Sequence, residues 1–479
     1  MLPRVSWSRR EVLATLGVAS GSAILFACGA PTKRVQRANA IDSEIRGWLQ
    51  DAVAILAGAG FEKPHALAVS RRRTTAAIDV LGAGVARARC DGVVLTVREK
   101  SGVLREQVTN DLSRDGVLAA VRELAGKAKP ADLDFGAPPG PVEATVPDPD
   151  LVTDDEMLDR VAALVARDKG LSSRIVYAAA AIDIDDSRVW SVAPARMLEQ
   201  RLVRVRRSLT RVAWHGSRPF VSEATRAWTG GIDAQDLTDD EIAATRDNAL
   251  ALLTPQAFED GERAFVLEPG VAAALIDAGV RTLLTSEAQR RPEVARRLAS
   301  GQPVSERVTL VDDPTVANAY GSFRFDDRGA VANPTTLIDK GRVIGRVERG
   351  RRPGHVGRTE VIPSHLRLAG GTVAADALLD NGMILEGHTS TLVDPASDRF
   401  VIQVARAREQ LGGHRTGRMF ADIELVGELT KLFSTLGELS KETRSIGVRD
   451  EVDGQPRHRS IETPWLLGTG LLRQRRRPA

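Results

Sequence analysis

The stretch from residue 311 to 345 constrains the fold of this chain more than any other part of the sequence. Three runs follow one another there, over 311–314, 320–329 and 336–345. Apolar and polar residues alternate inside each run, and glycine or aspartate-containing corners separate the runs. Such alternation is typical of half-buried strands, and such corners are typical of hairpins. The sequence therefore predicts a β-meander in this region.

Residues 41–255 are expected to form an α/β domain with an antiparallel sheet. Apolar spacing predicts helices over 41–56 and 113–124, and capping boxes that begin at Thr153 and Thr238 predict two more. Short alternating runs predict strands near 66–70, 75–81, 85–90, 92–97, 104–108, 174–181, 189–192 and 202–213. Six prolines between 127 and 150 predict a linker or an extended crossing segment.

Residues 256–479 are expected to form a β-rich domain. This domain begins with an Ala/Leu-rich, buried helix over 270–284 and continues through the meander. Further expected elements are strands near 359–362, 383–387, 400–405 and 464–467, a polar turn region over 410–417, and a helix over 425–436. The chain is thus expected to be an α+β protein of two domains.

The first 28 residues are interpreted as an export signal and not as part of the fold. Arg9 and Arg10 form a twin-arginine signature, and the apolar run over 16–27 is short for a membrane span. Cys28 follows a leucine and a small residue, which resembles a bacterial lipobox with Cys28 as the lipidated mature N-terminus. An uncleaved anchor helix or an ordinary cleaved signal is the alternative. With 29–40 as a polar tether, we expect a membrane-anchored lipoprotein, periplasmic or at the cell surface.

Charge and cysteine usage narrow the choice of partners. Lys plus Arg number 66 and Asp plus Glu 63, a net charge of +3, which is too balanced to indicate nucleic-acid binding. Arg204 and Arg206 share one face of a predicted strand; we expect that face to be solvated, with attraction to anionic lipids as the functional alternative. Cys90 is the only cysteine besides Cys28, so no disulfide forms within the mature chain, and we expect Cys90 to be a small core residue.

The order of these pieces resembles the TldD/PmbA (TldD/TldE) family of metallopeptidases and their partner subunits. The likeness covers about residues 41–470 and rests on the meander, on the lead-in over 265–276, on the turn over 109–113 and on the stretch over 381–400. It implies a two-domain fold and a pair of like-folded subunits. It also implies that the pair encloses a cavity for extended, unfolded peptides, which add to a sheet edge.

In that family a helical His-Glu-x-x-x-His box binds zinc, and this chain departs from it. Alignment on the lead-in puts Asp277 at the first His, Ala278 at the Glu and Thr282 at the second His. An Asp is able to ligate zinc, but Ala278 cannot act as a base and Thr282 is a poor ligand. The thiolate that the family's enzymes carry near the C-terminus is also missing, because residues 446–450 contain no Cys.

The resemblance therefore points to the zinc-less, TldE-like side of the family. It implies no catalytic residue and no cofactor in this chain, with zinc only in a partner subunit. Expected partners are a TldD-like subunit or a second copy of this chain, unfolded peptides, and the membrane through the lipid anchor. Two alternatives stay open: an active metallopeptidase with a metal site rebuilt from His365, Glu386 and His388, or an exported peptide-binding module without a proteolytic partner.

Overall fold

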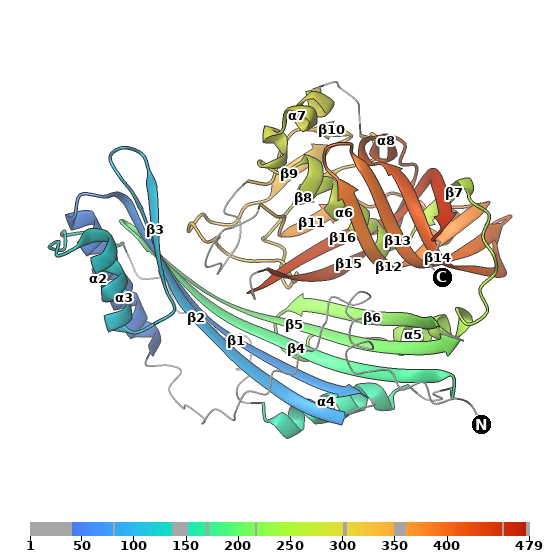
Figure 1. Cartoon of the computed structure of the whole chain (residues 1–479), viewed down its shortest axis with the longest axis horizontal. Coiled ribbons are helices and arrows are strands. Elements are labelled where there is room, and N and C mark those ends of the chain that lie inside the picture. The colour runs from blue at the N-terminus through green and yellow to red at the C-terminus, as the bar shows by residue number, and fades with distance from the viewer. Residues whose placement is uncertain are drawn as a thin grey trace.

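The computed structural model describes residues 41–79, 82–136, 152–168, 172–215, 218–299, 304–348, 361–452 and 455–475. Two sheets organise the chain, and one follows the other in sequence (Figure 1). This arrangement confirms the expected α+β class, with an antiparallel sheet and helices first and a β-rich part second. Arg9, Arg10, Cys28 and the predicted tether lie outside the described residues. In the described part of the chain, no helix is both long and apolar enough to cross a membrane.

The first sheet has six antiparallel strands in the order β3-β2-β1-β4-β5-β6. These strands are β1 (Glu62–Asp79), β2 (Gly82–Arg98), β3 (Leu104–Thr109), β4 (Ile175–Ala193), β5 (Arg196–His215) and β6 (Arg218–Thr229). Of the five short strands expected between 66 and 108, the one near 104–108 is confirmed as β3. The breaks expected between the other four are wrong, because those four merge into β1 and β2. Residues 71–74 continue β1 because β4 pairs with them along their whole length, and Arg71 Nε donates to Ser187 Oγ at 3.1 Å.

Four helices cover one face of this sheet. They are α2 (Ile41–Gly58), α3 (Arg114–Ala125), α4 (Asp154–Ala166) and α5 (Asp239–Ala251). Apolar side chains of α2 and α3 pack on one end of the sheet, and those of α4 and α5 pack on the other end. Both predicted capping boxes are present: the Thr153 and Thr238 side chains accept from the backbone N–H of Glu156 and Glu241.

The second sheet is mixed and has ten strands, with helix α6 packed against it. Its strands are β7 (Gly261–Leu267), β8 (Leu310–Asp312), β9 (Thr335–Asp339), β10 (Arg342–Val343), β11 (His365–Leu368), β12 (Gly382–Asp394), β13 (Arg399–Leu411), β14 (His414–Glu428), β15 (Leu439–Val452) and β16 (Gln455–Gln474). Its helices are α6 (Pro269–Leu283), α7 (Pro292–Ala299) and α8 (Leu429–Ser434). The predicted domain boundary at 255 and 256 lies in sequence between α5 and β7, and it stays a prediction.

The meander is only partly as expected. β8, β9 and β10 do form antiparallel neighbours. The middle run over 320–329 is not a strand; its Tyr320 and Phe325 are buried, and Phe325 packs against Leu67 and Val189 of the first sheet. This run therefore joins the two halves of the molecule instead of extending the second sheet.

Several other local expectations are wrong. Residues 425–428 belong to strand β14, so the helix expected over 425–436 is reduced to the short α8. The turn region expected over 410–417 narrows to residues 412 and 413, because β13 and β14 extend into it. Residues 361 and 362 are not in a strand. Cys90 is exposed, and not a core residue, because β2 pairs with β3 only from Val93 onward.

The second half of the chain covers the face of the first sheet that lies opposite α2, α3, α4 and α5. Arg204 on β5 donates to the carbonyl oxygens of Tyr320 at 3.0 Å and Ser322 at 3.2 Å. Gln200 donates to the carbonyl of Phe325 at 2.9 Å. Arg206 is 12% exposed and donates to Glu223 on β6 at 2.7 Å. The expectation of a solvated face at Arg204 and Arg206 is therefore wrong, and neither side chain is available to attract lipid headgroups.

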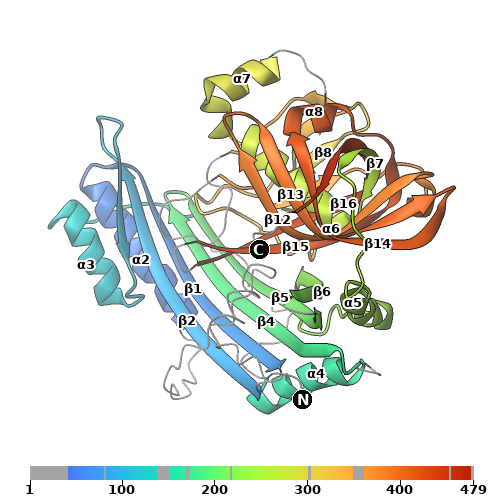
Figure 2. The same cartoon turned by 45° about the vertical axis from the view of Figure 1, so that its right-hand side comes forward.

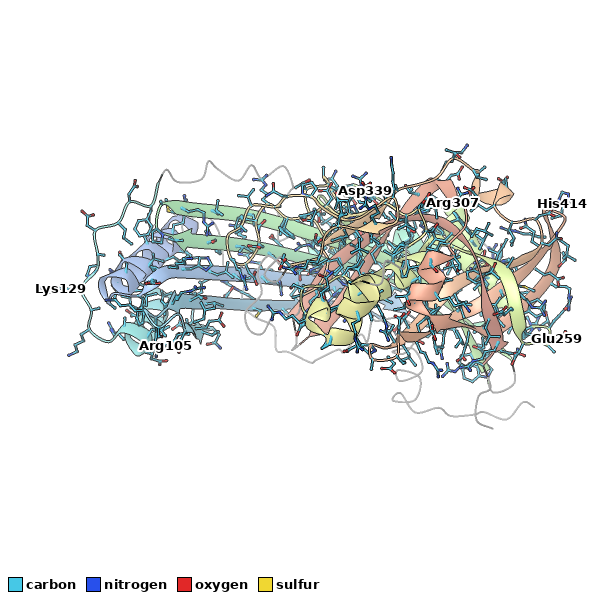
Figure 3. The ribbon with its side chains drawn as sticks, turned by 90° about the horizontal axis from the view of Figure 1, so that it is seen from above. Arg105, Lys129, Glu259, Arg307, Asp339 and His414 are labelled. Carbon is cyan, nitrogen blue, oxygen red and sulfur yellow. The ribbon has the colours of Figure 1, made fainter. Side chains whose placement is uncertain are left out.

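The turned view shows where the second sheet lies over the first (Figure 2). The second sheet stands over β4, β5 and β6, whereas α2 and α3 lie at the far end of the first sheet. Seen from above, Arg105 and Lys129 mark that far end, and Glu259 and His414 mark the opposite end of the molecule (Figure 3).

Candidate functional site

Helix α6 provides the backbone of the candidate site. It begins with Pro269, which suits a first helical turn because its missing N–H has no partner there in any case. One side of the helix is buried in the core of the second half, where Gly279 lies so close to the Phe433 ring that a Cβ would clash at 2.4 Å. The opposite side of the helix faces a cleft.

The cleft has a volume of about 630 Å³ and lies between α6, β12, β15 and β16. Its wall is partly apolar, with Ala273, Ala274, Val361, Ile362, Val393 and Ile461 among the lining residues. Asp277, Ala278 and Thr282, the three positions aligned with the zinc box, all line it. Ile446, Val448 and Asp450, from the stretch aligned with the missing thiolate, line it as well. The structure thus brings together the two parts of the site that the sequence marked as altered.

A buried arginine joins these two parts. Arg459 on β16 donates through one guanidinium nitrogen to Asp450 Oδ2 on β15 at 2.6 Å. Its other terminal nitrogen bonds to Asp277 on α6. The Arg459 side chain is 2% exposed, against 15% for Asp277 and 37% for Asp450. Burial works against the charge, but the carboxylates of Asp277 and Asp450 outweigh it and raise the pKa of Arg459.

The residues of the cleft do not fit a zinc ion. Asp277 and Asp450 are both engaged by Arg459, and Ala278 offers no donor atom. A dication placed among these groups would face a fixed guanidinium within a few ångströms, and like charges at that distance repel strongly in a partly buried site. Within the described residues, His, Cys, Asp and Glu side chains nowhere gather in a group of three that could hold a metal.

The three residues considered for a rebuilt metal site have separate partners. His365 is 1% exposed, and its Nδ1 lies 2.7 Å from Ser460 Oγ. Glu386 is buried and accepts from the Nε of Arg406 and of Arg408, both at 2.7 Å. His388 lines the cleft, with its Nε2 2.8 Å from Thr391 Oγ1.

Sequence reasoning missed Arg459. Alternation gives no signal there, because residues on both faces of this part of β16 are buried, with Ser460 on one face and Ile461 on the other. The final strand is moreover predicted to begin only at 464, beyond Arg459.

Comparisons with known proteins agree with the geometry of the second half. Residues 260–471 match the model of the PmbA/TldA metallopeptidase C-terminal domain. A metalloprotease of Methanocaldococcus jannaschii is 23% identical over 282 residues, which covers 54% of this chain and 61% of that protein. The match thus spans less than two thirds of that relative's length.

Two solved structures share the fold over most of this chain. One, from Bacteroides thetaiotaomicron, is described as a candidate modulator of DNA gyrase; it has a TM-score of 0.68 at 15% identity and covers 90% of this chain and 99% of its own. The other, TldE from Thermococcus kodakarensis, has a TM-score of 0.62 at 15% identity and covers 87% of this chain and 98% of its own. At such identities the likeness shows the fold alone.

Proposed function

Since this chain belongs to the TldD/PmbA family of metallopeptidase-like proteins, we propose that it is the non-catalytic subunit of a peptide-processing pair. In this proposal it holds unfolded peptide and does not cleave it. Hydrolysis is performed by a TldD-like partner that carries zinc.

One observation carries the proposal: Arg459 bridges Asp277 and Asp450 in the cleft where the family's zinc box would be. Metal-assisted hydrolysis needs an open coordination position and a base that takes a proton from the bound water. Ala278 cannot be that base. The two carboxylates that could ligate a metal are already hydrogen-bonded to the Arg459 guanidinium.

The cleft has features that suit an extended peptide. β13 pairs with β12 along its whole length, but on the other edge β7 reaches only Met383 to Leu385. Beyond Leu385 the N–H of Gly387 donates to the Glu268 carboxylate at 2.7 Å. In the part of the chain that the structure describes, residues 388–394 of that edge have no strand partner, and His388, Thr391 and Val393 of β12 line the cleft. An unpaired edge offers backbone hydrogen bonds to a peptide of any sequence.

Export and anchoring belong to the same proposal. A twin-arginine signal at Arg9 and Arg10 would carry the folded chain out of the cytoplasm. Lipidation at Cys28 would then hold it at a membrane, periplasmic or at the cell surface. The partner would be a TldD-like subunit or a second copy of this chain.

The test compares the purified mature chain with the complex that co-purifies from native membranes. We expect the chain alone to contain no stoichiometric zinc and to leave an unstructured peptide intact. The complex should cleave the peptide, and a chelator should stop it. Stoichiometric zinc together with chelator-sensitive cleavage by this chain alone would overturn the proposal.

A matched pair of substitutions tests peptide holding. Ala274 on α6 lines the cleft, so Ala274→Trp should fill part of it and raise the KM of the complex several-fold with little change in kcat. Ala119→Trp, on the exposed surface of α3, is the control and should change neither constant. Equal kinetics for both variants would exclude this cleft as the peptide-binding site.

A further inference from the structure

We propose that the guanidinium of Arg459 takes the structural place of a divalent metal ion between α6 and β15. Its positive charge also prevents metal ions from binding in the cleft. The inference concerns the site of the proposed function and rests on that function only for the location of the site. It adds an account of how α6, β15 and β16 are held together in this cleft without a metal ion.

The arrangement resembles a metal centre in which one central group is bound by side chains from two different elements. Asp277 projects from α6 and Asp450 from β15, and these two elements meet through the Arg459 guanidinium of β16. A guanidinium presents several donors in a rigid plane, so it fixes the directions of two carboxylates at once. A metal ion between a helix and a strand would impose the same kind of constraint.

The charges also balance as they would around a dication. Asp277 and Asp450 contribute two negative charges, and Arg459 contributes one positive charge. Arg281, one turn along α6, lies 3.9 Å from Asp277 Oδ2 and supplies the second. The group is therefore neutral without any bound ion.

The two arginines are not equivalent. The Arg459 side chain is 2% exposed and bonds to both carboxylates, whereas the Arg281 side chain is 44% exposed and reaches only Asp277. Removal of Arg459 would leave two carboxylates beside an apolar wall without their main partner, which is strongly unfavourable. Removal of Arg281 would break only a partly exposed ion pair with Asp277, which should change the stability little. Arg281 is therefore a control from the same cleft.

The first test is a coupling measurement on the full mature chain. Arg459→Met should lower the Tm by about 5 °C, and Arg281→Met should change it by less than about 1 °C. Asp277→Asn and Asp450→Asn should each lower the Tm when Arg459 is present. In the Arg459→Met background the same two substitutions should raise the Tm, because they remove the unpaired charges. Equal effects of the Asn substitutions in both backgrounds would show that Arg459 only packs, and would overturn the inference.

The second test measures metal binding directly. Titration with Zn²⁺, followed by calorimetry, should show at least a tenfold tighter site in Arg459→Met than in the wild-type chain or in Arg281→Met. The triple variant that also carries Asp277→Asn and Asp450→Asn should lose this gain. If Arg459→Met folds and gains no affinity, the guanidinium does not exclude metal and the inference fails.

A charge-preserving variant covers the case in which Arg459→Met does not fold. Arg459→Lys keeps the positive charge and gives up the planar fork, so its Tm should fall by less, and it should still not bind Zn²⁺. Tight zinc binding by Arg459→Lys would overturn the inference. Peptide cleavage by the wild-type chain alone would instead overturn the proposed function and leave the coupling result standing, so the two failures are distinguishable.

Discussion

Gly447 on β15 lies directly against Ala227 on β6, so close that a Cβ on Gly447 would come within 2.3 Å of the Ala227 Cβ. The same Cβ would lie 3.3 Å from the Tyr320 ring. At this point the second sheet touches the first, and the contact has no room for one more methyl group. The glycine sits within the stretch over 446–450 that also supplies Asp450 to the cleft.

Gly447→Ala should therefore destabilise the chain by about 1–3 kcal/mol, because an added methyl group must displace packed neighbours. Urea unfolding followed by circular dichroism measures the change. Gly47→Ala on α2 is the matched control, since its Cβ would meet nothing within 4 Å. There the substitution should be neutral or stabilise by up to about 1 kcal/mol, through helix propensity. Equal effects at the two glycines would contradict this account of the contact.

Asp168, which follows α4, and Arg211 on β5 form a buried ion pair on the helix-covered side of the first sheet. Arg211 Nε donates to Asp168 Oδ2 at 2.8 Å, and neither side chain is exposed. Asp168→Asn should cost about 3–5 kcal/mol, because it leaves the guanidinium buried and without its counter-charge. Asp247→Asn is the control: Asp247 pairs with Arg246 at 2.8 Å but is 62% exposed, so its loss should change stability by less than about 0.5 kcal/mol. Thermal unfolding measures the loss of stability in both variants, and equal losses would contradict this account of the Asp168–Arg211 pair.

Local signals in the sequence predicted local structure well. The capping boxes at Thr153 and Thr238 need only four consecutive residues, and both form as expected. Helix α6 likewise follows from its own apolar composition. In contrast, Leu425 lies in a strand although its neighbourhood reads as helical, because β14 is paired along its length with β13. Tertiary pairing overrode the local preference there.

The prediction for Arg204 and Arg206 failed for a related reason. Alternation along β5 separates its two faces correctly, and Val203 and Val205 face the helices. Alternation along a strand does not show which part of the chain packs on the face that carries Arg204. Residues 320–325, more than a hundred positions away, supply that cover. The same limit applies to the cleft, since Arg459 is 182 positions from Asp277 and no local pattern links them.

Burial of His365 predicts a pH dependence of stability. Burial lowers the pKa of His365 from 6.5 to about 4, Arg367 acts in the same direction, and Glu462 and Asp313 oppose it. Above pH 6.5 the imidazole is neutral in both the folded and the unfolded chain, so stability is complete. Below pH 6.5 the unfolded chain takes up a proton that the folded chain refuses until about pH 4. The free energy of unfolding should therefore fall as pH falls through this window, by about 2 kcal/mol at pH 5 from this residue.

His365→Asn tests this assignment, because an amide placed near Nδ1 still reaches Ser460 Oγ, the 2.7 Å partner of the ring, and does not titrate in the same range. Urea unfolding between pH 7 and pH 4.5 should show a shallower decline for this variant than for the wild-type chain. His458 is also buried and its pKa is lowered well below 6.5, so part of the decline should remain. His414→Asn, at the exposed β13–β14 turn, should leave the curve unchanged. A decline as steep in His365→Asn as in the wild-type chain would mean that His365 is protonated while folded, which its 1% exposure and its packing against Ser460 argue against.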